Sequence, residues 1–504
     1  MEFALKNKKI ILWFLLLPIT AFFLLSCSKN DEVEIFLGLD TETKAAEIFD
    51  SLIDANGNGG FLIYDINEKK VVSSRNRKVP FIPASTTKVP VTIAALKVLG
   101  PEYRFKTTAG FTGSVKDGVL NGDLYLKGTG DPLLNAVHLM IMAGRIKSYG
   151  INKITGNFYF DETELFSSEV IDSGMQNYEA YNQGVSALSL DMNSVYAWWE
   201  KNKSDKKTYV NIVPSLPIFK ADIIEKKRDE EARYEYIPGK TVEKWIITQD
   251  TRNRGRERLP VKKPGLYTAM LLKKFCAMQG LELPEPSTGA VPGKIKVIHE
   301  HSGRSVIEIS DIILTYSNNM MTELLLLETA KKLTGKVLNF DSSASAVTDY
   351  LKKRMKNIDW SGYKIVNGSG LTSLNRITPE QLAAFFIYAD GIDLNGRNYF
   401  SLLPASGWEG SMSKRLFEDD SAFRVWAKTG AVNYAASLAG YMFSMSGKKF
   451  IFAIMLTDFS ERKLYDSLSA ADKEERDISQ KAYAWSEKNK NLIDKIVSEW
   501  IKAL

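Results

Sequence analysis

Ser85 and Lys88 stand three positions apart where an apolar segment, Val89–Leu96, begins. Residues three apart lie on the same side of a helix, so the Lys88 amine can take the proton of the Ser85 hydroxyl and make it a nucleophile. The first turn of a helix also carries free N–H groups and the positive end of the helix dipole, which favour a developing negative charge beside Ser85. We therefore predict nucleophilic chemistry at Ser85 with Lys88 as its base.

The spacing Ser-x-x-Lys is weak evidence by itself. Pro83 and Ala84 lead into the segment, and Pro90 falls near the first helical turn, where proline is tolerated. The spacing nevertheless occurs seven times in the chain, starting at Ser26, Ser85, Ser204, Ser361, Ser411, Ser446 and Ser460. Six of these copies are interpreted as chance, so the choice of Ser85 depends on the residues that accompany it.

Two downstream motifs carry further residues suited to the same chemistry. Lys428-Thr429-Gly430 is the only Lys-Thr-Gly of the sequence, whereas Ser-x-Asn occurs four times. Of these four, Ser317-Asn318-Asn319 stands at the start of an apolar helical segment, Met320–Leu327, and lies between the other two motifs in the chain. The ordered trio predicts one site built from three distant segments.

A lysine base is also favoured by the small supply of histidine. The three histidines, His138, His299 and His301, show no spacing that suggests a Ser-His-Asp site, and we expect them in loops or at strand edges. An ordinary lysine, with a pKa of about 10.4, is protonated at neutral pH and cannot act as a base. Burial and a second cation nearby would lower the pKa of Lys88, and Lys428 is the candidate for that cation.

The Lys428-Thr429-Gly430 segment is predicted at a strand edge beside the pocket. Gly430 would let the backbone of a substrate approach closely, Thr429 can bind a carboxylate oxygen, and Lys428 supplies positive charge for it. The N–H groups of Ser85 and Ala431 would then form the oxyanion hole. These residues are the predicted substrate-binding part of the site.

The N-terminus has the layout of an export signal. Lys6, Lys8 and Lys9 precede an apolar run at 10–25, and a serine and a cysteine follow. Residues 24–27, Leu-Leu-Ser-Cys, resemble a bacterial lipobox, which predicts that Cys27 is the lipidated first residue of the mature chain. An uncleaved membrane anchor is the alternative, but the run of 16 residues is short for a bilayer span of about 20.

Length and composition indicate a globular protein of several domains. The 504 residues exceed the roughly 250–300 at which a single core stops growing, and 44% hydrophobic with 25% charged residues is ordinary. The net charge of +6 is mild, and basic clusters such as Arg-Asn-Arg-Gly-Arg at 252–256 predict a solvated face rather than nucleic-acid binding. Cys276 lies in an apolar helical pattern and is expected to be a buried, inert thiol.

Strand and helix patterns divide the chain into a helix-rich part and a strand-rich insertion. Residues 61–65 and 70–73 indicate a strand pair, while 435–443 and 449–456 are apolar enough for central strands of one sheet. The predicted division is a signal peptide at 1–26, a tether at 27–40, a discontinuous catalytic domain at 41–104 and 309–504, inserted domain II at 105–200 and 264–308, and a smaller inserted domain III at 201–263.

From about Phe61 onward, these motifs resemble those of the D-alanyl-D-alanine carboxypeptidase/endopeptidase family of low-molecular-mass class C penicillin-binding proteins. The trio is a signature that penicillin-binding proteins share with serine β-lactamases. The 232 positions between Ser85 and Ser317 fit the family's two inserted domains, whereas β-lactamases have a much shorter gap. The resembling segments, in the family's order, are 83–88, 128–132, 186–190 with Asn193, 317–319 with Glu323, 367–371 and 427–430.

The resemblance implies an α/β (α+β) fold of the penicilloyl-serine transferase and β-lactamase type. This fold is an α/β/α sandwich on a five-stranded antiparallel sheet with an all-helical part, here with two mainly β inserted domains. The implied activity is that of a serine-type D-Ala-D-Ala carboxypeptidase or endopeptidase acting on peptidoglycan stem peptides. The expected partners are stem peptides, β-lactam antibiotics as covalent inhibitors, and the membrane through a lipid anchor at Cys27 on the periplasmic side of the envelope. No metal, cofactor or nucleic acid is called for.

Three positions depart from the family pattern. Asn367 stands where the family usually has aspartate, Ser373 stands where arginine is common, and Asn318 replaces the usual middle aspartate. The role of the loop around Asn367 is therefore open. The residue roles that the resemblance implies are nucleophile for Ser85, base for Lys88, proton relay to the leaving group for Ser317, binding of the substrate amide for Asn319, and binding of the terminal carboxylate for Lys428 and Thr429.

Three alternatives stay open. Tyr316 and Asn318 could form the Tyr-x-Asn of class C β-lactamases in place of Ser317 and Asn319, although Glu323 favours the serine register. The same apparatus could serve a β-lactamase or an esterase, which would deacylate a penicilloyl adduct rapidly. A non-catalytic envelope lipoprotein that binds peptidoglycan would form no such adduct.

Overall fold

The structure is a computed structural model, and it describes residues 32–35, 37, 43–53, 58–226, 233–249, 254–469, 472–473 and 476–504. Cys27, the predicted signal peptide and most of the predicted tether lie outside these residues. In the part of the chain that is described, no helix is both long and apolar enough to span a membrane. The described part of the tether is paired, since β1 (Val33–Glu34) runs parallel to β18 (Met355–Lys356) and Ile35 is buried.

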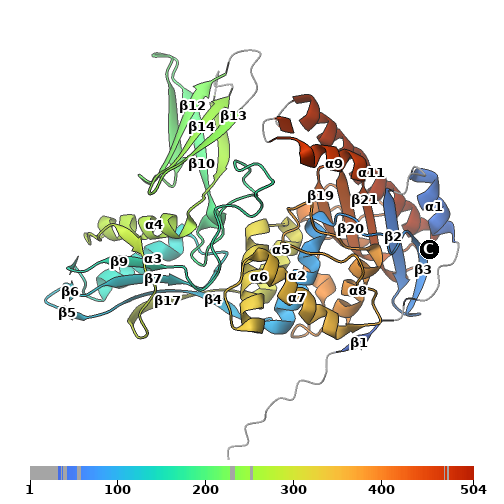
Figure 1. The fold of residues 1–504 in the computed structure, drawn as a ribbon, viewed down its shortest axis with the longest axis horizontal. Helices are drawn as coiled ribbons and strands as arrows, with labels where there is room; N and C mark the ends of the chain where they lie inside the picture. The colour runs from blue at the N-terminus through green and yellow to red at the C-terminus, as the bar shows by residue number, and fades with distance from the viewer. Residues whose placement is uncertain are drawn as a thin grey trace, which may run out of the picture.

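A five-stranded antiparallel sheet, the main sheet, joins strands from the two ends of the chain (Figure 1). Side chains alternate between its faces, so Phe61 and Ile63 pack with helices on one face while Leu62 and Tyr64 pack with helices on the other. The main sheet is therefore buried on both sides. Its strands, in order, are β19 (Val425–Val432), β20 (Ala435–Phe443), β21 (Lys449–Thr457), β2 (Gly59–Asp65) and β3 (Lys70–Arg75).

Helices cover both faces of the main sheet and extend into a helical part (Figure 1). On one face lie α1 (Lys44–Leu52) and α11 (Arg476–Ala503), and on the other lies α8 (Pro379–Asp390). These layers confirm the predicted α/β/α sandwich with an all-helical part. The helical part contains α2 (Lys88–Val98), α5 (Val306–Tyr316), α6 (Asn319–Thr334) and α7 (Phe340–Arg354), and α9 (Phe459–Ser467) follows the last strand.

Helix α2 is the central helix of the helical part. Its residues from Lys88 to Leu96 are all buried, as is typical of a helix that is apolar all round. A 3₁₀ turn, η1 (Ala84–Thr87), precedes it, so Ser85 lies in this turn and the α-helix begins at Lys88. The predicted nucleophile Ser85 and base Lys88 thus lie on the two sides of the junction between a turn and a helix.

The segment between α2 and α5 builds strand-rich layers away from the main sheet (Figure 1). Its larger sheet carries the helices α3 (Ala136–Ser148) and α4 (Pro264–Met278). This sheet has the order β16 (Pro286–Thr288), β9 (Phe158–Asp161), β7 (Leu124–Gly128), β4 (Arg104–Phe111) and β17 (Lys296–Ser305), and a small sheet holds β5 (Ser114–Lys116), β6 (Val119–Asn121) and β8 (Lys153–Ile154).

Six further strands form two three-stranded sheets of this insertion, at the top of Figure 1 above α4. Their buried side chains, such as Val195 and Trp245, belong to the same hydrophobic cluster as the larger inserted sheet. The strand content confirms mainly β insertions, and the boundaries of domains II and III stay a prediction. The orders are β11 (Thr208–Val213), β10 (Ser194–Lys201), β15 (Arg254–Pro260), and β12 (Phe219–Glu225), β14 (Glu243–Gln249), β13 (Arg233–Pro238).

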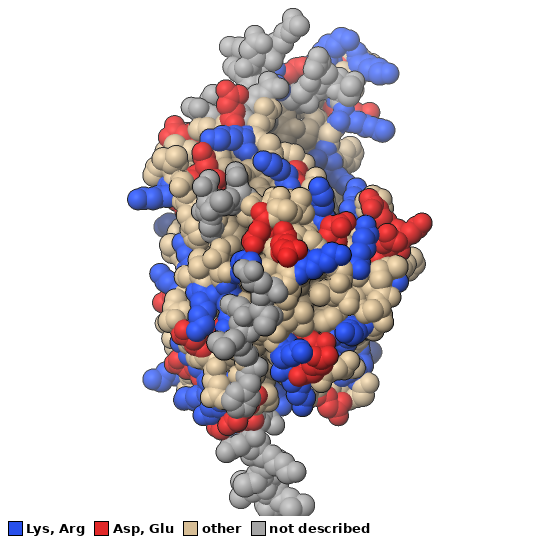
Figure 2. Space-filling view, turned by 90° about the vertical axis from the view of Figure 1, so that its right-hand side faces the viewer, with Lys and Arg blue, Asp and Glu red and all other residues tan. Residues whose placement is uncertain are grey.

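Surface charge is mixed at the end of the molecule that carries the main sheet. Figure 2 shows lysine and arginine interspersed with aspartate and glutamate over this face. The mild positive charge of the chain is therefore not gathered into one patch there.

Candidate active site

Ser85 is held in the η1 turn by contacts with the main sheet. The hydroxyls of Thr86 and of Ser437 on β20 both donate to the carbonyl oxygen of Pro83, each at 2.7 Å. The Ser437 bond ties the turn to the sheet on one side, the Thr86 bond lies within the turn, and α2 continues from it on the other side. The predicted nucleophile thus lies in a rigid segment at the edge of two cavities.

Lys88 is fully buried, and its amine contacts three oxygen atoms. Nζ lies 2.9 Å from Ser85 Oγ, 2.8 Å from Asn319 Oδ1 and 2.5 Å from the carbonyl oxygen of Ser369. The last two atoms can only accept hydrogen bonds, whereas the Ser85 hydroxyl can also donate. A neutral Lys88 therefore gives its two N–H groups to Asn319 and Ser369 and directs its lone pair at Ser85. This is the orientation that a general base requires.

Burial lowers the pKa of Lys88 to about 7, because the ammonium form is poorly solvated inside the protein. The nearby carboxylate of Glu323 acts in the opposite direction and raises this pKa. Burial, one of the two predicted causes, is therefore the largest cause of the lowering. The two amines also repel each other, and the pKa of Lys428 is lowered well below its usual range by burial and by the charge of Lys88.

Glu323 connects the base to a buried loop. Its fully buried carboxylate, on α6, accepts the backbone N–H groups of Gly368 at 3.0 Å and Ser369 at 2.7 Å. The carbonyl oxygen of Ser369 is the one that accepts from Lys88, so Glu323 sets the position of this acceptor. Burial raises the pKa of Glu323, while the hydrogen bonds from Ser369 and the charge of Lys88 oppose the rise.

Ser317 and Lys428 form a second pair of hydroxyl and amine. Lys428 Nζ is buried on β19 and donates to Ser317 Oγ at 3.0 Å and to the carbonyl oxygen of Thr429 at 2.8 Å. Ser317 follows α5 in the left-handed conformation, with φ 60° and ψ 36°, which costs roughly 1–2 kcal/mol for a residue with a side chain. Backbone strain of this kind is concentrated at functional sites.

Gly430 brings β19 against the Ser85 turn. A Cβ on this residue would lie 2.2 Å from Ser437 Oγ, 2.5 Å from the Pro83 carbonyl oxygen and 3.2 Å from the Ser85 nitrogen. The glycine therefore allows the Ser85 turn to approach the strand, and close approach of the substrate backbone at Gly430 stays a prediction. Its neighbour Ala431 lines both cavities beside Ser85.

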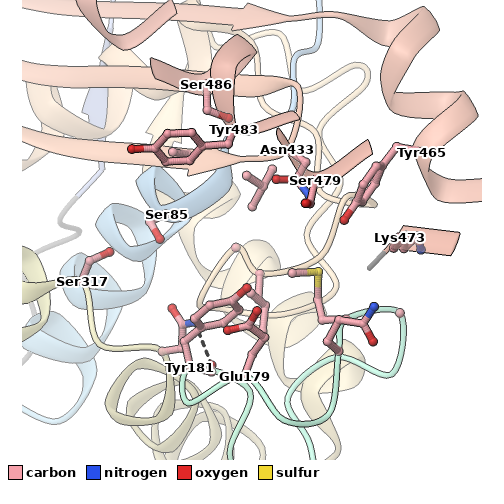
Figure 3. Close-up of a pocket in the computed structure, with 18 of the residues that line it drawn as sticks. Ser85, Glu179, Tyr181, Ser317, Asn433, Tyr465, Lys473, Ser479, Tyr483 and Ser486 are labelled. Atoms are coloured by element: carbon pink, nitrogen blue, oxygen red, sulfur yellow. Dashed lines mark hydrogen bonds between the residues drawn. The ribbon is translucent and has the colours of Figure 1, made fainter. Parts of the chain in front are cut away.

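Two cavities meet at Ser85 and Ser317. The larger, of about 640 Å³, lies between a loop of the insertion and the helices α9 and α11. Figure 3 shows the two serines side by side at one end, with Tyr181 of that loop across the cavity from Tyr483 of α11. The second cavity, of about 390 Å³, opens beside Thr429 and is lined by the charged residues Lys414, Arg415, Glu487, Lys490 and Asp494.

Asn319 links the base to the insertion. Its Oδ1 accepts from Lys88, and its Nδ2 donates to the carbonyl oxygen of Tyr181 at 3.0 Å, drawn as the dashed line in Figure 3. Each side of the amide thus meets a complementary partner, which defines its orientation. The loop that carries Tyr181 belongs to the site, and no sequence motif signals this because the contact uses a backbone oxygen.

The alternative Tyr-x-Asn register does not fit these contacts. Tyr316 is 69% exposed, and Asn318 caps α6 by accepting the N–H of Met321 at 2.9 Å. The neighbours Ser317 and Asn319 are the residues that contact the two buried lysines. The structure therefore brings together all five predicted catalytic residues, whose roles in the reaction stay predictions.

The loop around Asn367 supports the Ser85 turn. Asn367 Oδ1 accepts the N–H of Gly370 at 3.1 Å, and its carbonyl oxygen accepts Asn375 Nδ2 at 3.1 Å. Gly370 has φ 76°, and a Cβ there would lie 1.8 Å from the carbonyl oxygen of Ala84. Only glycine therefore permits the loop to pack on η1. Ser373 lies further on, at a separate cavity.

Comparison with known proteins identifies the group to which this site belongs. A family model for the D-Ala-D-Ala carboxypeptidase 3 (S13) family matches residues 45–477. The chain belongs to this family. This S13 protein is 24% identical over 429 residues to the D-alanyl-D-alanine carboxypeptidase DacB of Haemophilus influenzae, covering 80% of this chain and 86% of that protein. It is also 24% identical over 418 residues to the D-alanyl-D-alanine carboxypeptidase of an Actinomadura species, covering 76% and 74% of the two chains.

Solved structures show the same fold. The crystal structure of penicillin-binding protein 4 (dacB) from Haemophilus influenzae has a TM-score of 0.75 at 20% identity and covers 88% of this chain and 100% of its own. A second crystal structure of that protein, in complex with a β-lactam, has a TM-score of 0.72 at 21% identity and covers 83% and 94%. The predicted family and fold class are confirmed. The S13 protein is a serine-type carboxypeptidase of the cell envelope.

Proposed function

We propose that this S13 carboxypeptidase removes the terminal D-alanine of peptidoglycan stem peptides through an acyl-enzyme on Ser85. The observation that carries the proposal is the 2.9 Å contact between the Lys88 amine and the Ser85 hydroxyl. A lysine whose pKa is about 7, and whose N–H groups have other acceptors, can take a proton that an ordinary lysine cannot.

Acylation begins when Lys88 takes the proton of Ser85 and Oγ attacks the carbonyl carbon of the penultimate D-alanine. The N–H groups of Ser85 and Ala431 stabilise the oxyanion of the tetrahedral intermediate. When the C–N bond breaks, the leaving amine receives a proton through Ser317 from Lys428, which lies 3.0 Å from the Ser317 hydroxyl. The products of this step are the acyl ester on Ser85 and free D-alanine.

Deacylation reverses the proton flow. A water molecule gives a proton through Ser317 to the now neutral Lys428, and its oxygen attacks the ester carbon. The C–O bond to Ser85 then breaks, and Lys88 returns its proton to Ser85 Oγ. Both lysines thus regain their starting protonation states, and the shortened peptide leaves.

The substrate carboxylate has a binding site at the second amine. Thr429 lines the second cavity, where the terminal carboxylate would lie, and the buried Lys428 amine is behind it, 3.5 Å from the Thr429 hydroxyl oxygen. A charged hydrogen bond there is worth about 1.5–3 kcal/mol. The carboxylate also stabilises the ammonium form of Lys428, whose pKa in the free protein is lowered.

Labelling with a fluorescent penicillin tests the nucleophile. The purified protein is expected to gain one covalent penicilloyl group, detected by fluorescence and by intact mass. Ser85→Ala is expected to lose the label, while the matched control Ser204→Ala, in an exposed Ser-x-x-Lys of the insertion, keeps it. Full labelling of Ser85→Ala would contradict the assignment, and rapid loss of the label from the wild type would favour a β-lactamase.

A second candidate activity is cleavage of peptide cross-links. The cavity of about 390 Å³ continues beyond Thr429, so the position of the terminal D-alanine is not closed off and a longer peptide chain has room there. Digestion of purified muropeptides followed by mass spectrometry separates the two activities. Release of D-alanine alone supports the carboxypeptidase, and conversion of cross-linked dimers to monomers supports the endopeptidase.

The lipid anchor at Cys27 is also proposed, on the strength of the lipobox-like segment 24–27. Metabolic labelling with a fatty-acid analogue is expected to mark the protein, and Cys27→Ser is expected to remove the label and release the protein from membranes. Unchanged labelling of Cys27→Ser would contradict the anchor.

A further inference from the structure

One face of the inserted sheet β11-β10-β15 exposes aromatic side chains in an unusual number. Tyr196 is 42% exposed, Trp198 40% and Tyr209 51%, although large aromatic rings are usually buried. The opposite face of the same strands holds Val195 and Ala197, which are buried in the core of the insertion, and the buried Trp199. The exposed aromatics therefore have no packing role in that core.

The register of the sheet places arginines beside these rings. Trp198 stands opposite Arg256, and Tyr196 stands opposite Arg258, while Arg254 pairs with the next outward residue of β10, Glu200. Side chains of directly paired residues lie on the same face, so three arginines line one edge of the aromatic residues. The guanidinium of Arg256 lies 5.0 Å from the ring centroid of Tyr196. Glu200 and Asp205, which accepts from the Tyr209 hydroxyl at 2.7 Å, are outnumbered by the three arginines, so this face is positively charged.

We propose that this aromatic–arginine face, formed by Tyr196, Trp198, Tyr209, Arg254, Arg256 and Arg258, binds the peptidoglycan polymer. The flat rings present apolar surfaces on which the C–H faces of sugar rings can stack. The guanidinium groups match the free carboxylates of stem peptides, which they bind in a bidentate way. The charge of the face is complementary to that polymer, and the inference rests on the proposed function because it takes the enzyme's own substrate as the ligand.

The position of the face explains what such binding would add. Its sheet stands at the upper end of the insertion in Figure 1, apart from the main sheet. A glycan strand held there stays close to the enzyme after each cleavage, so the local concentration of further stem peptides rises without any change at Ser85. The face is thus expected to speed the hydrolysis of polymeric substrate and to leave the hydrolysis of a short soluble peptide unchanged.

Co-sedimentation of the purified protein with isolated peptidoglycan sacculi tests this proposal. The double variant Trp198→Ala, Arg256→Ser is expected to bind sacculi about tenfold more weakly, which corresponds to about 1.4 kcal/mol, and added salt is expected to weaken the wild type further. Lys220→Ser, which removes an exposed cation from the neighbouring sheet, is the matched control and should bind as the wild type does.

Two readouts separate the possible outcomes. Penicillin labelling and hydrolysis of a soluble D-Ala-D-Ala peptide should be the same in the double variant as in the wild type. If the wild type itself shows neither labelling nor hydrolysis, the proposed function is refuted, whereas the surface proposal is tested by sedimentation alone. Equal sedimentation of variant and wild type would overturn the surface proposal. Equal or tighter binding of the wild type to DNA or to anionic phospholipid vesicles, lost in the double variant, would also overturn it.

A separate observation concerns the loop that carries Tyr181. The next residue, Asn182, is fully buried; its side chain accepts the N–H groups of Ile171 at 2.9 Å and Asp172 at 3.0 Å and donates to the carbonyl oxygen of Asp172 at 2.9 Å. Its carbonyl oxygen accepts from the buried Lys262 amine at 2.9 Å. The loop is therefore braced from within and from the base of the inserted sheet.

We infer that Asn182 and Lys262 are positioning residues for the general base. They hold the Tyr181 carbonyl oxygen against Asn319 Nδ2, and this contact turns Asn319 Oδ1 toward Lys88. If the carbonyl oxygen moves away, the amide can rotate and present its NH₂ group to Lys88. The lysine then loses an acceptor that directs its lone pair.

The pH profile of penicillin acylation tests this inference, which also rests on the proposed function. Asn182→Ala and Lys262→Met are expected to lower the acylation rate about tenfold and to displace the rising limb of the profile, while Lys262→Arg restores both. Folded variants with the wild-type rate and profile would overturn the inference. A slower rate with an unchanged limb would also overturn it, because that is the result expected of a purely structural role.

Discussion

The rate of penicillin acylation is expected to rise with pH and then level off, because the reactive form of Lys88 is the neutral amine. With a pKa of about 7, roughly 9% of the amine is neutral at pH 6 and roughly 90% at pH 8. The rate constant should therefore increase about tenfold between these pH values and change little above pH 8. A lysine with the ordinary pKa of about 10.4 would instead give a rate that rises about tenfold per pH unit throughout.

Glu323→Gln is the perturbation that tests the cause of this profile. The carboxylate of Glu323 raises the pKa of Lys88, so its removal is expected to shift the rising limb to lower pH. Glutamine preserves the shape of the side chain, but its NH₂ group cannot accept one of the two backbone N–H groups that Glu323 binds. The variant is therefore also expected to lose about 1–3 kcal/mol of unfolding free energy.

The assay is stopped-flow acylation by a chromogenic cephalosporin between pH 5.5 and 9.5, with folding checked by urea denaturation at each end of the range. Glu328→Gln is the control. Glu328 lies on the same helix, but its carboxylate accepts from the Tyr103 hydroxyl at 2.7 Å, so this change should leave the rising limb of the pH profile in place. A wild-type rate that keeps rising through pH 9, or a limb that moves to higher pH in Glu323→Gln, would refute the reasoning about Lys88.

Three further predictions concern the cleft. Gly430→Ala is expected to slow acylation about 100-fold, because the added Cβ displaces the Ser85 turn; Gly293→Ala, where a Cβ meets open space, should react normally. Lys428→Met is expected to weaken hydrolysis of a peptide with a free C-terminal carboxylate about 10- to 100-fold, with a smaller loss on the amidated peptide; equal losses would argue against carboxylate binding. The pKa of Lys428 is lowered in the free protein and a bound carboxylate raises it, so binding of a D-Ala-D-Ala peptide to the Ser85→Ala variant is expected to take up protons, seen as buffer-dependent calorimetric heats in a series from pH 6 to 10. Heats that do not depend on the buffer anywhere in this range would contradict this.

Much of the fold is predictable because its strands and helices have strong local patterns. The apolar segments at 435–443 and 449–456 form neighbouring strands of the main sheet, and the unbroken burial of α2 follows from its apolar sequence. The pairing of β2 with β21 is different, since it joins residues almost 400 positions apart and depends on long-range packing. The same holds for the strand pair of Val33–Glu34 inside the predicted tether.

The sequence by itself determined which side chains make up the candidate site. Ser85, Lys88, Ser317, Asn319 and Lys428 were identifiable because a unique Lys-Thr-Gly and an ordered Ser-x-Asn select one Ser-x-x-Lys among seven. These are choices of residue type and order along the chain, and both can be read from the printed sequence.

Only the tertiary structure decided the surroundings that suit Lys88 to the predicted role of base. The acceptor at Ser369 and the partner of Asn319 at Tyr181 are backbone oxygens, which every residue carries, so no residue type signals them. The low pKa of Lys88 comes from burial, which is a property of the whole packed core and not of the motif. Gly430 was found from its motif, but its contact with the Ser85 turn depends on two segments that meet only after folding.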